Sequence, residues 1–380
     1  MECAKSRRSQ HLPLCEFLIM DNKKSSKKNL IWIFLGLVLV MLAAVTALVI
    51  YVDPFFHYHG PRDGFYYVVD NQLSQNPGMA RNMDYDSCII GSSMTVNFHT
   101  DDFYELMGLN TLKLSYSGAY PKDDSNILNI VFDKDSYARK NNDVKAVFLG
   151  LDVPTLTADV NEIKYELPMY LYDDNPINDV KYLWNKDVLL QYIMRPFIQK
   201  KGTNLSEAYA SWWTDEYYNI QWVMHNYEEP QRVETEADKE LFIEQTGENL
   251  KVNILPFVEE NPDTQFYVFF PPYSILYWNN VICENHLEAT MRQYEFAAEE
   301  FLKYDNVHLF YFQNMEEVVT DLNNYADYTH YKPEINRYMT ECFADGTHEV
   351  RSMEQFEDEL SSMRDIIERF DFEELFSVEY

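Results

Sequence analysis

An uncharged stretch of 23 residues, from Leu30 to Val52, constrains this chain more than any other feature of its sequence. At about 1.5 Å per residue, a helix of this length crosses a hydrocarbon core of roughly 30 Å. A cleaved signal peptide has a shorter apolar core followed by a small-x-small site, and the alanines of this stretch never form Ala-x-Ala. We therefore predict an uncleaved transmembrane helix over residues 30–52.

The charges that precede this stretch predict its orientation. Residues 1–29 hold seven basic and three acidic side chains. Because positively charged flanks stay on the cytoplasmic side, we expect a cytoplasmic N-terminal tail over 1–29 and a single-pass cell-membrane protein whose remainder is extracytoplasmic. Met20 begins a short basic leader of its own, so it is a second candidate start of translation, which the intact mass of the native protein would decide.

The part of the chain after the apolar stretch is strongly acidic. The whole sequence has 31 basic and 62 acidic residues, so 24 basic and 59 acidic residues remain from Asp53 onward, a net charge of −35. Such a surface excludes nucleic acid as a partner. It also disfavours broad docking on anionic lipid or polyanionic wall polymers, except at a local patch.

Cysteine and histidine spacing gives little sign of a metal or of a disulfide framework. Cys283 and Cys342 are the only pair left once the two cysteines before the span and Cys88, in a predicted strand, are set aside. His57 and His59 alternate like strand neighbours, but no third ligand lies near them in the sequence, so we favour a structural or interfacial role. We predict no cofactor and no metal.

Beyond a connector over residues 53–84, which we expect to be irregular, apolar runs alternate with helical patterns. The predicted strands are residues 87–90, 111–114, 144–150, 265–270 and 307–312. The predicted helices are residues 96–107, 123–137, 236–259 with a kink before Pro256, 286–304, 333–343 and 353–370. Strands separated by helices of this length predict an α/β fold with a doubly wound, mostly parallel sheet.

Residues 155–235 interrupt this alternation. They are rich in tyrosine and tryptophan and show helix-like patterns without a clear strand, which predicts an inserted helical cap. The cap tryptophans are Trp184, Trp212, Trp213 and Trp222. Their rings could stack on sugars, although buried packing is the commoner role. The α/β domain then spans residues 85–345, and residues 346–380 form a C-terminal helical tail.

Two short motifs follow the first and the last predicted strand. Gly91-Ser92-Ser93 is predicted to form a tight turn between a strand and the start of a helix. A serine at such a turn is either a helix cap or an exposed nucleophile. Asp327-Tyr328-Thr329-His330 places a carboxylate three residues before a histidine, and a histidine base needs such a carboxylate on its second ring nitrogen. If both loops lie at one sheet edge, Ser93, His330 and Asp327 can act as nucleophile, base and orienter.

Together these motifs resemble the SGNH (GDSL-like) hydrolase superfamily, whose first block is Gly-Asp-Ser and whose last is Asp-x-x-His. The Gly-Ser-Ser form is similar to that of membrane-anchored bacterial members linked to lipoteichoic-acid D-alanylation and to polysaccharide O-acylation. The resemblance covers residues 53–345, with the cap outside it. It implies a flavodoxin-like three-layer sandwich and a catalytic triad of Ser93, Asp327 and His330.

The same resemblance implies an oxyanion hole made by the amides of Ser93 and of Gly118, in the Ser115–Ala119 segment after the second strand. The third block departs from the family, because Gly150-Leu151-Asp152-Val153 stands where Gly-x-Asn-Asp is expected. A charged Asp152 would repel an oxyanion. Either Asp152 points away and has a structural role, or the hole uses backbone amides alone.

The function that this resemblance implies is an extracytoplasmic serine esterase or O-acyltransferase, which moves an acyl group, foremost acetyl, between a donor and a cell-surface glycan or polymer. A multi-span membrane acyltransferase is the partner it implies. The alternative is a non-catalytic surface protein that keeps the fold and binds a glycan or that acyltransferase. The sequence leaves open the acyl group, the acceptor, hydrolysis against transfer, and the oligomeric state.

Overall fold

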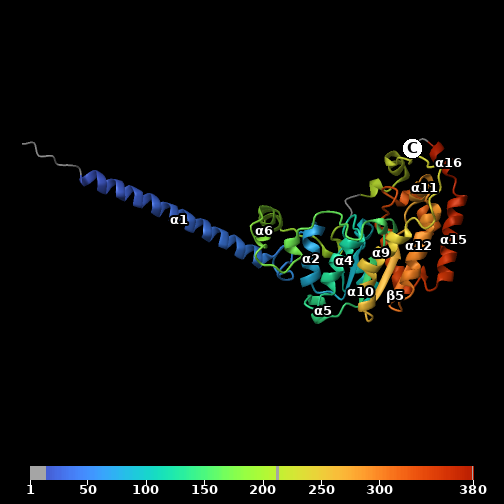
Figure 1. Ribbon diagram of the computed structural model, residues 1–380, viewed down its shortest axis with the longest axis horizontal. Coiled ribbons are helices and arrows are strands. Elements are labelled where there is room, and N and C mark those ends of the chain that lie inside the picture. The colour runs from blue at the N-terminus through green and yellow to red at the C-terminus, as the bar shows by residue number, and fades with distance from the viewer. Residues whose placement is uncertain (1–13, 211–213, 379) are drawn as a thin grey trace, which may run out of the picture.

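A mixed six-stranded sheet forms the centre of the protein, as a computed structural model that describes residues 14–210, 214–378 and 380 shows (Figure 1). Residues 1–13 of the predicted tail, and Trp212 and Trp213 of the predicted cap, lie outside the described residues. The strands are β1 (Ser87–Ile90), β2 (Thr111–Lys113), β3 (Ala146–Gly150), β4 (Gln265–Phe270), β5 (Val307–Tyr311) and β6 (Glu349–Val350).

The strand order is β2-β1-β3-β4-β5-β6, with all neighbours parallel except β5 and β6. The first five follow one of the usual orders of doubly wound α/β sheets. All five predicted strands form, because continuous apolar runs of this kind are typical of strands buried on both faces. The antiparallel β6 was not predicted, since its two residues are too few to show a pattern.

Helices make up most of the remaining regular structure. They are α1 (Leu14–Val52), α2 (Gln72–Asn82), α3 (Thr100–Met107), α4 (Pro121–Val131), α5 (Tyr137–Asn141), α6 (Val180–Leu183), α7 (Arg195–Gln199), α8 (Ile220–Asn226), α9 (Ile243–Asn249), α10 (Leu255–Glu260), α11 (Ile275–Cys283), α12 (Leu287–Phe301), α13 (Glu316–Val319), α14 (Pro333–Asp345), α15 (Met353–Arg369) and α16 (Phe372–Ser377). Two π-helical segments, η4 (Val188–Met194) and η7 (Leu250–Ile254), precede α7 and α10.

Aromatic side chains join the sheet to helices on both of its faces. In β4, Phe269 contacts Phe343 of α14 with ring centroids 5.2 Å apart, and its neighbour Phe270 contacts Tyr294 of α12 at the same separation. Because successive strand residues point to opposite faces, α14 and α12 cover opposite sides of the sheet. The α/β class predicted from the sequence is thereby confirmed.

The prediction of an irregular connector over residues 53–84 was wrong for α2. Pro77 and Gly78 lie inside this helix, where they would ordinarily weaken it. The proline leaves the carbonyl of Leu73 without its helical donor, and the hydroxyl of Tyr172 donates to that carbonyl at 3.0 Å. A Cβ on Gly78 would lie 2.0 Å from the carbonyl oxygen of Phe55, so only glycine allows α2 to pack so closely on the chain after α1.

Three predicted helices are divided in the structure. Residues 236–259 form α9, η7 and α10, and the π-helical segment η7 comes just before Pro256, where the sequence predicted a kink. The patterns over 96–107 and 123–137 each contain a break, so that α3 begins only at Thr100 and α4 ends at Val131. The sequence analysis also missed α11, which is short and almost wholly buried.

The apolar helix α1 projects as a straight rod from the α/β body (Figure 1). Its part from Lys28 to Val52 is long and apolar enough to cross a membrane. The cap helix α6 and the segment η4 contact α1 near Val52. Val49, Val52 and Phe55 share a buried apolar cluster with cap residues, so the cap is held to the end of α1.

The cysteines and histidines singled out in the sequence have ordinary structural surroundings. Cys88, Cys283 and Cys342 are free thiols, and all three are buried. His57 pairs with the carboxylate of Asp179, while both ring nitrogens of His59 lie within hydrogen-bond distance of backbone carbonyls. Both histidines therefore hold together the segment that follows α1.

The tight contact at Gly78 gives a test of this packing. We expect Gly78→Ala to lower the free energy of unfolding by about 2–3 kcal/mol, because the added methyl meets backbone that cannot rotate away. Thermal melting of the full chain in detergent measures the effect. Ser74→Ala in the same helix is the matched control, and it should change stability by less than about 0.5 kcal/mol. Equal melting of the two variants would show that α2 is not packed as described.

Candidate active site

The predicted site residues gather at the carboxyl edge of the sheet. Ser93 follows β1, Gly118 follows β2, Asp152 follows β3, and Asp327 and His330 lie in the chain after β5. Ligands of open α/β sheets bind outside this edge, at the point where the strand order reverses. Here β1 has β2 on one side and β3 on the other, so the reversal lies beside Ser93.

A tight turn presents Ser93 at this edge. Gly91 has φ 139°, a conformation that L side chains rarely adopt, and a Cβ there would lie 2.8 Å from the carbonyl oxygen of Gly150. The hydroxyl of Ser92 accepts a hydrogen bond from the amide of Met94 and caps the short helix η1 (Ser93–Thr95). Ser92 thus has the capping position, while Ser93 is only partly buried.

The structure brings Ser93, His330 and Asp327 into one hydrogen-bonded chain. Ser93 Oγ lies 2.8 Å from His330 Nε2, and His330 Nδ1 lies 2.7 Å from Asp327 Oδ2. A carboxylate accepts hydrogen bonds, so Nδ1 carries the proton and Nε2 is left to accept the serine proton. This is the geometry in which a histidine acts as general base toward a serine.

Asp327 is held in the ionised form that this arrangement needs. Its Oδ1 accepts hydrogen bonds from the backbone amides of Thr329 and His330, both at 2.8 Å. Burial by itself would raise the pKa of this carboxyl, but the hydrogen bond and charge of His330 and the two amides outweigh burial and lower the pKa below its ordinary value. The carboxylate therefore stays charged and orients the imidazole ring.

Contacts with other elements hold the Asp327–His330 loop in place. Tyr325 and Tyr331 form an antiparallel bridge that closes the loop. The hydroxyl of Tyr331 donates to the carbonyl of Met94 in the nucleophile turn at 3.0 Å, and the hydroxyl of Ser274, after β4, donates to the carbonyl of Tyr328 at 2.7 Å. Sequence reasoning missed these two positioning residues, because only the fold places them beside the motif.

Gly118 lies in the turn after β2 with φ 76°. The turn is held from α2, where the side chain of Gln72 accepts from the amide of Ser117 and the buried side chain of Asn76 donates to the carbonyls of Leu114 and Ser115. Among the hydrogen bonds of the described residues, none uses the amide of Ser93 or of Gly118. Both candidate oxyanion donors therefore keep their N–H groups available.

Asp152 is buried and engaged by neighbouring hydroxyls. Tyr273 donates a hydrogen bond to its carboxyl, and Ser92 bonds to it as well. Burial raises the pKa of Asp152 above its ordinary value, although these two bonds and His330 act in the opposite direction. This engagement fits the first of the two alternatives, a structural role, and the raised pKa reduces the negative charge near Ser93.

A buried lysine contacts the chain just after the turn that holds Ser93. Lys113, in β2, is 1% exposed, and its ammonium donates to the carbonyl of Val96 at 2.7 Å. Burial lowers the pKa of Lys113 to about 7. The sequence analysis did not single out this residue, because a lysine in a three-residue edge strand reads as an exposed charge.

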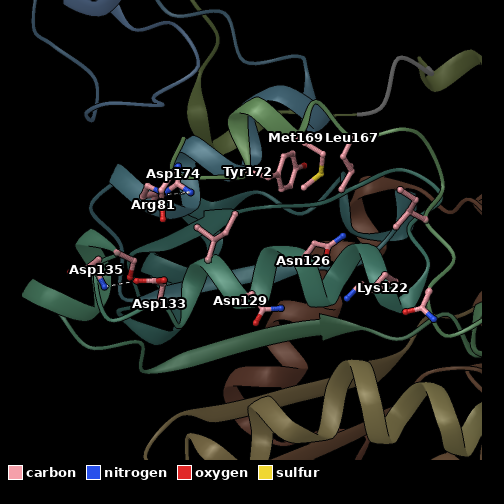
Figure 2. A pocket seen from close by; sticks show the side chains of 14 residues that line it. Arg81, Lys122, Asn126, Asn129, Asp133, Asp135, Leu167, Met169, Tyr172 and Asp174 are labelled. Carbon is pink, nitrogen blue, oxygen red and sulfur yellow. Dashed lines mark hydrogen bonds and ion pairs between the residues drawn. The ribbon is translucent and has the colours of Figure 1, made fainter. Parts of the chain in front are cut away.

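A groove of about 680 Å³, lined by both polar and apolar side chains, lies elsewhere on the protein, along α4 (Figure 2). Lys122, Asn126 and Asn129 line it from α4, and Met169 and Tyr172 line it from the cap. None of the three residues Ser93, Asp327 and His330 belongs to its lining. The groove therefore lies apart from the hydrogen-bonded chain of Ser93, His330 and Asp327.

No family model, no curated protein and no solved structure matches the chain.

The charge of Asp152 gives a pH-dependent test. In Asp152→Asn the amide keeps an acceptor for Tyr273 but is never charged, so we expect faster reaction of Ser93 with a fluorophosphonate probe. Wild-type Asp152 gains its negative charge as pH rises, so the ratio of variant to wild-type rates should increase with pH and approach one in acid. The second-order labelling rate across a pH series measures this ratio. A variant that is slower at every pH would show instead that the carboxylate assists His330.

Proposed function

We propose that this protein is an extracytoplasmic, membrane-anchored serine enzyme of the SGNH type, with that superfamily's three-layer sandwich, that moves acyl groups through an acyl-enzyme on Ser93. The observation that carries the proposal is the hydrogen-bonded chain from Ser93 through His330 to Asp327, with separations of 2.8 and 2.7 Å. Its location at the carboxyl edge of the sheet, beside the point of strand reversal, supports the same assignment.

In the first step, Ser93 Oγ attacks the carbonyl carbon of an acyl ester while His330 Nε2 takes the hydroxyl proton. The carbonyl oxygen becomes an oxyanion, which the amides of Ser93 and Gly118 stabilise; one well-placed donor of this kind lowers the barrier by about 3 kcal/mol. The bond from the carbonyl carbon to the leaving alcohol then breaks, and His330 returns the proton to that alcohol. The acyl group stays on Ser93 as an ester.

In the second step, His330 deprotonates a hydroxyl that attacks the acyl-enzyme, and Ser93 leaves with its proton restored. If water attacks, the enzyme is an esterase; if a sugar hydroxyl attacks, it is an O-acyltransferase. We favour transfer of an acetyl group to a cell-surface glycan or polymer, since the membrane-anchored proteins that the sequence resembles work beside a multi-span acyltransferase. Neither role calls for a cofactor or a metal.

The membrane arrangement belongs to the same proposal. The apolar part of α1 would cross the cell membrane, with the basic N-terminal side in the cytoplasm and the acidic α/β domain outside. The support is the length and composition of the helix and the seven basic residues before it.

A second candidate function is a non-catalytic surface protein that binds a glycan or an acyltransferase subunit. The groove along α4 favours it, because the amide and charged side chains of Asn126, Asn129, Lys122 and Arg81 suit a polar ligand and lie outside the Ser93 site (Figure 2). Absence of any covalent labelling of the wild-type protein by fluorophosphonate would favour this function over the enzyme.

Substitution of Ser93 and of Asp327 tests the enzymatic proposal. We expect Ser93→Ala to abolish fluorophosphonate labelling and hydrolysis of a chromogenic acetyl ester, because the nucleophile is lost. Asp327→Asn should slow both by about 10⁴-fold, since the wrong tautomer of His330 is then favoured. Stopped-flow or gel-based labelling of the full chain measures these rates.

Ser92→Ala is the matched control. It removes the neighbouring hydroxyl and a helix cap, which costs about 1 kcal/mol of stability, but it leaves the bond between Ser93 and His330. Labelling of this variant should therefore persist. Loss of labelling in Ser92→Ala with labelling retained in Ser93→Ala would overturn the assignment of the nucleophile.

The orientation has its own test. In intact cells or right-side-out vesicles, we expect added protease to remove a C-terminal tag at Tyr380, and alkaline carbonate to leave the full chain in the membrane pellet. Protection of that tag until the membrane is permeabilised would reverse the proposed topology, and release by carbonate would exclude α1 as a membrane span.

A further inference from the structure

The cap packs alongside α1 rather than beyond its end. Val45, Val49 and Val52 form one stripe of α1 that joins a shared apolar cluster with cap residues. Beside this stripe, Trp184 Nε1 donates to Thr46 Oγ1 at 2.9 Å. Thr46 precedes Val52 by six residues, so this contact lies about 9 Å from the end of the apolar segment.

The cap also carries an apolar stripe that no part of the described chain covers. Leu190, Met194, Phe197 and Ile198 are 51%, 41%, 63% and 71% exposed. Their spacing places them on one side of the continuous helical segment formed by η4 and α7. Another side of this segment packs toward α1, since Val188 and Ile193 are buried in the cluster with α1.

Residues 180–201 carry a net positive charge, whereas the rest of the chain after α1 is acidic. Residues 180–201 hold the five basic residues Lys181, Lys186, Arg195, Lys200 and Lys201 and the single acidic residue Asp187. The part of the chain from Asp53 onward has a net charge of −35. An apolar stripe flanked by basic residues is the pattern of a helix that lies in the interface of an anionic membrane.

Buried hydrogen bonds fix the cap relative to α1. The hydroxyl of Tyr182, in α6, donates to Asp53 at 2.7 Å and accepts from the amide of Phe55. Asp179, just before α6, accepts from the hydroxyl of Tyr58 at 2.9 Å and pairs with His57. The position of α1 in a membrane would therefore set the position of the cap.

We propose that residues 180–201 are a second membrane contact, which lies in the interface of an anionic phospholipid bilayer beside α1 with Leu190, Met194, Phe197 and Ile198 facing the acyl chains. The proposal rests on the membrane-spanning role proposed for α1. Lipid is favoured over a protein partner because the stripe lies on a segment that packs beside α1 and its basic flank complements anionic headgroups. The depth of about 9 Å at Thr46 agrees with the roughly 5–10 Å to which interfacial helices are buried.

Tryptophan quenching tests this proposal without any partner protein. The full chain is reconstituted in vesicles of phosphatidylglycerol and phosphatidylcholine whose acyl chains carry bromine near the headgroup end. The fluorescence difference between wild type and Trp184→Phe is the Trp184 component, which reports on the cap. The difference between wild type and Trp32→Phe is the Trp32 component, which reports on α1. We expect bromolipid to quench both components, because each ring contacts lipid.

Quenching of the Trp32 component alone would overturn the cap contact and leave the anchor standing. Quenching of neither component would overturn both. Quenching of the Trp184 component alone would overturn the anchor, and with it the proposed contact beside α1. If the cap stripe instead binds a multi-span protein, the Trp184 component is not quenched in these pure lipid vesicles.

A charge variant tests the choice of anionic lipid. We expect Arg195→Gln/Lys200→Gln/Lys201→Gln to reduce quenching of the Trp184 component in phosphatidylglycerol vesicles to the level found in phosphatidylcholine alone. The matched control, Lys134→Gln/Lys251→Gln/Lys303→Gln, removes the same charge from the α/β body and should leave quenching unchanged. Equal quenching of wild type in the two lipids would overturn the electrostatic part of the proposal.

Discussion

The hydrogen bond between Ser93 and His330 joins residues 237 positions apart, and the rest of the site depends on it. The parallel sheet brings the two loops together, because it places the carboxyl ends of β1 and β5 at one edge. The bond from Tyr331 to the carbonyl of Met94 then ties the histidine loop directly to the nucleophile turn.

The parts of this arrangement that could be predicted are those with a local signal. The strands were recognisable as apolar runs, and Gly91-Ser92-Ser93 and Asp327–His330 as motifs at strand ends. Helix α2 could not be predicted, because its proline is compensated by the hydroxyl of Tyr172, 99 positions from the carbonyl that it contacts. Ser274 was missed for the same reason, since its partner Tyr328 is 54 positions away.

Asp152 illustrates how surroundings decide what a residue can do. From the sequence, a carboxylate in place of a neutral amide weakens the case for an oxyanion hole. In the structure, Tyr273 donates to it, Ser92 bonds to it and burial raises its pKa. Asp124 is buried close enough for the negative charge of Asp152 to help raise its own pKa. Burial and the charges of Asp123 and Asp152 all raise the pKa of Asp124, which favours its protonated form.

The distribution of charge has a consequence for how the domain would stand on a membrane. A body with an excess of acidic residues is repelled by an anionic leaflet, while the basic segment 180–201 of the cap is attracted to it. Both forces act within about 10 Å of the surface, the Debye length at 0.1 M salt, so they concern the parts next to the end of α1. Hydrogen bonds to Asp53 and from Tyr58 to Asp179 hold the cap to that end of α1. The attraction of residues 180–201 to the leaflet and the repulsion of the α/β body therefore act on one connected unit. If α1 spans a membrane, the balance favours a tilt that brings residues 180–201 to the lipid and raises the α/β body from it.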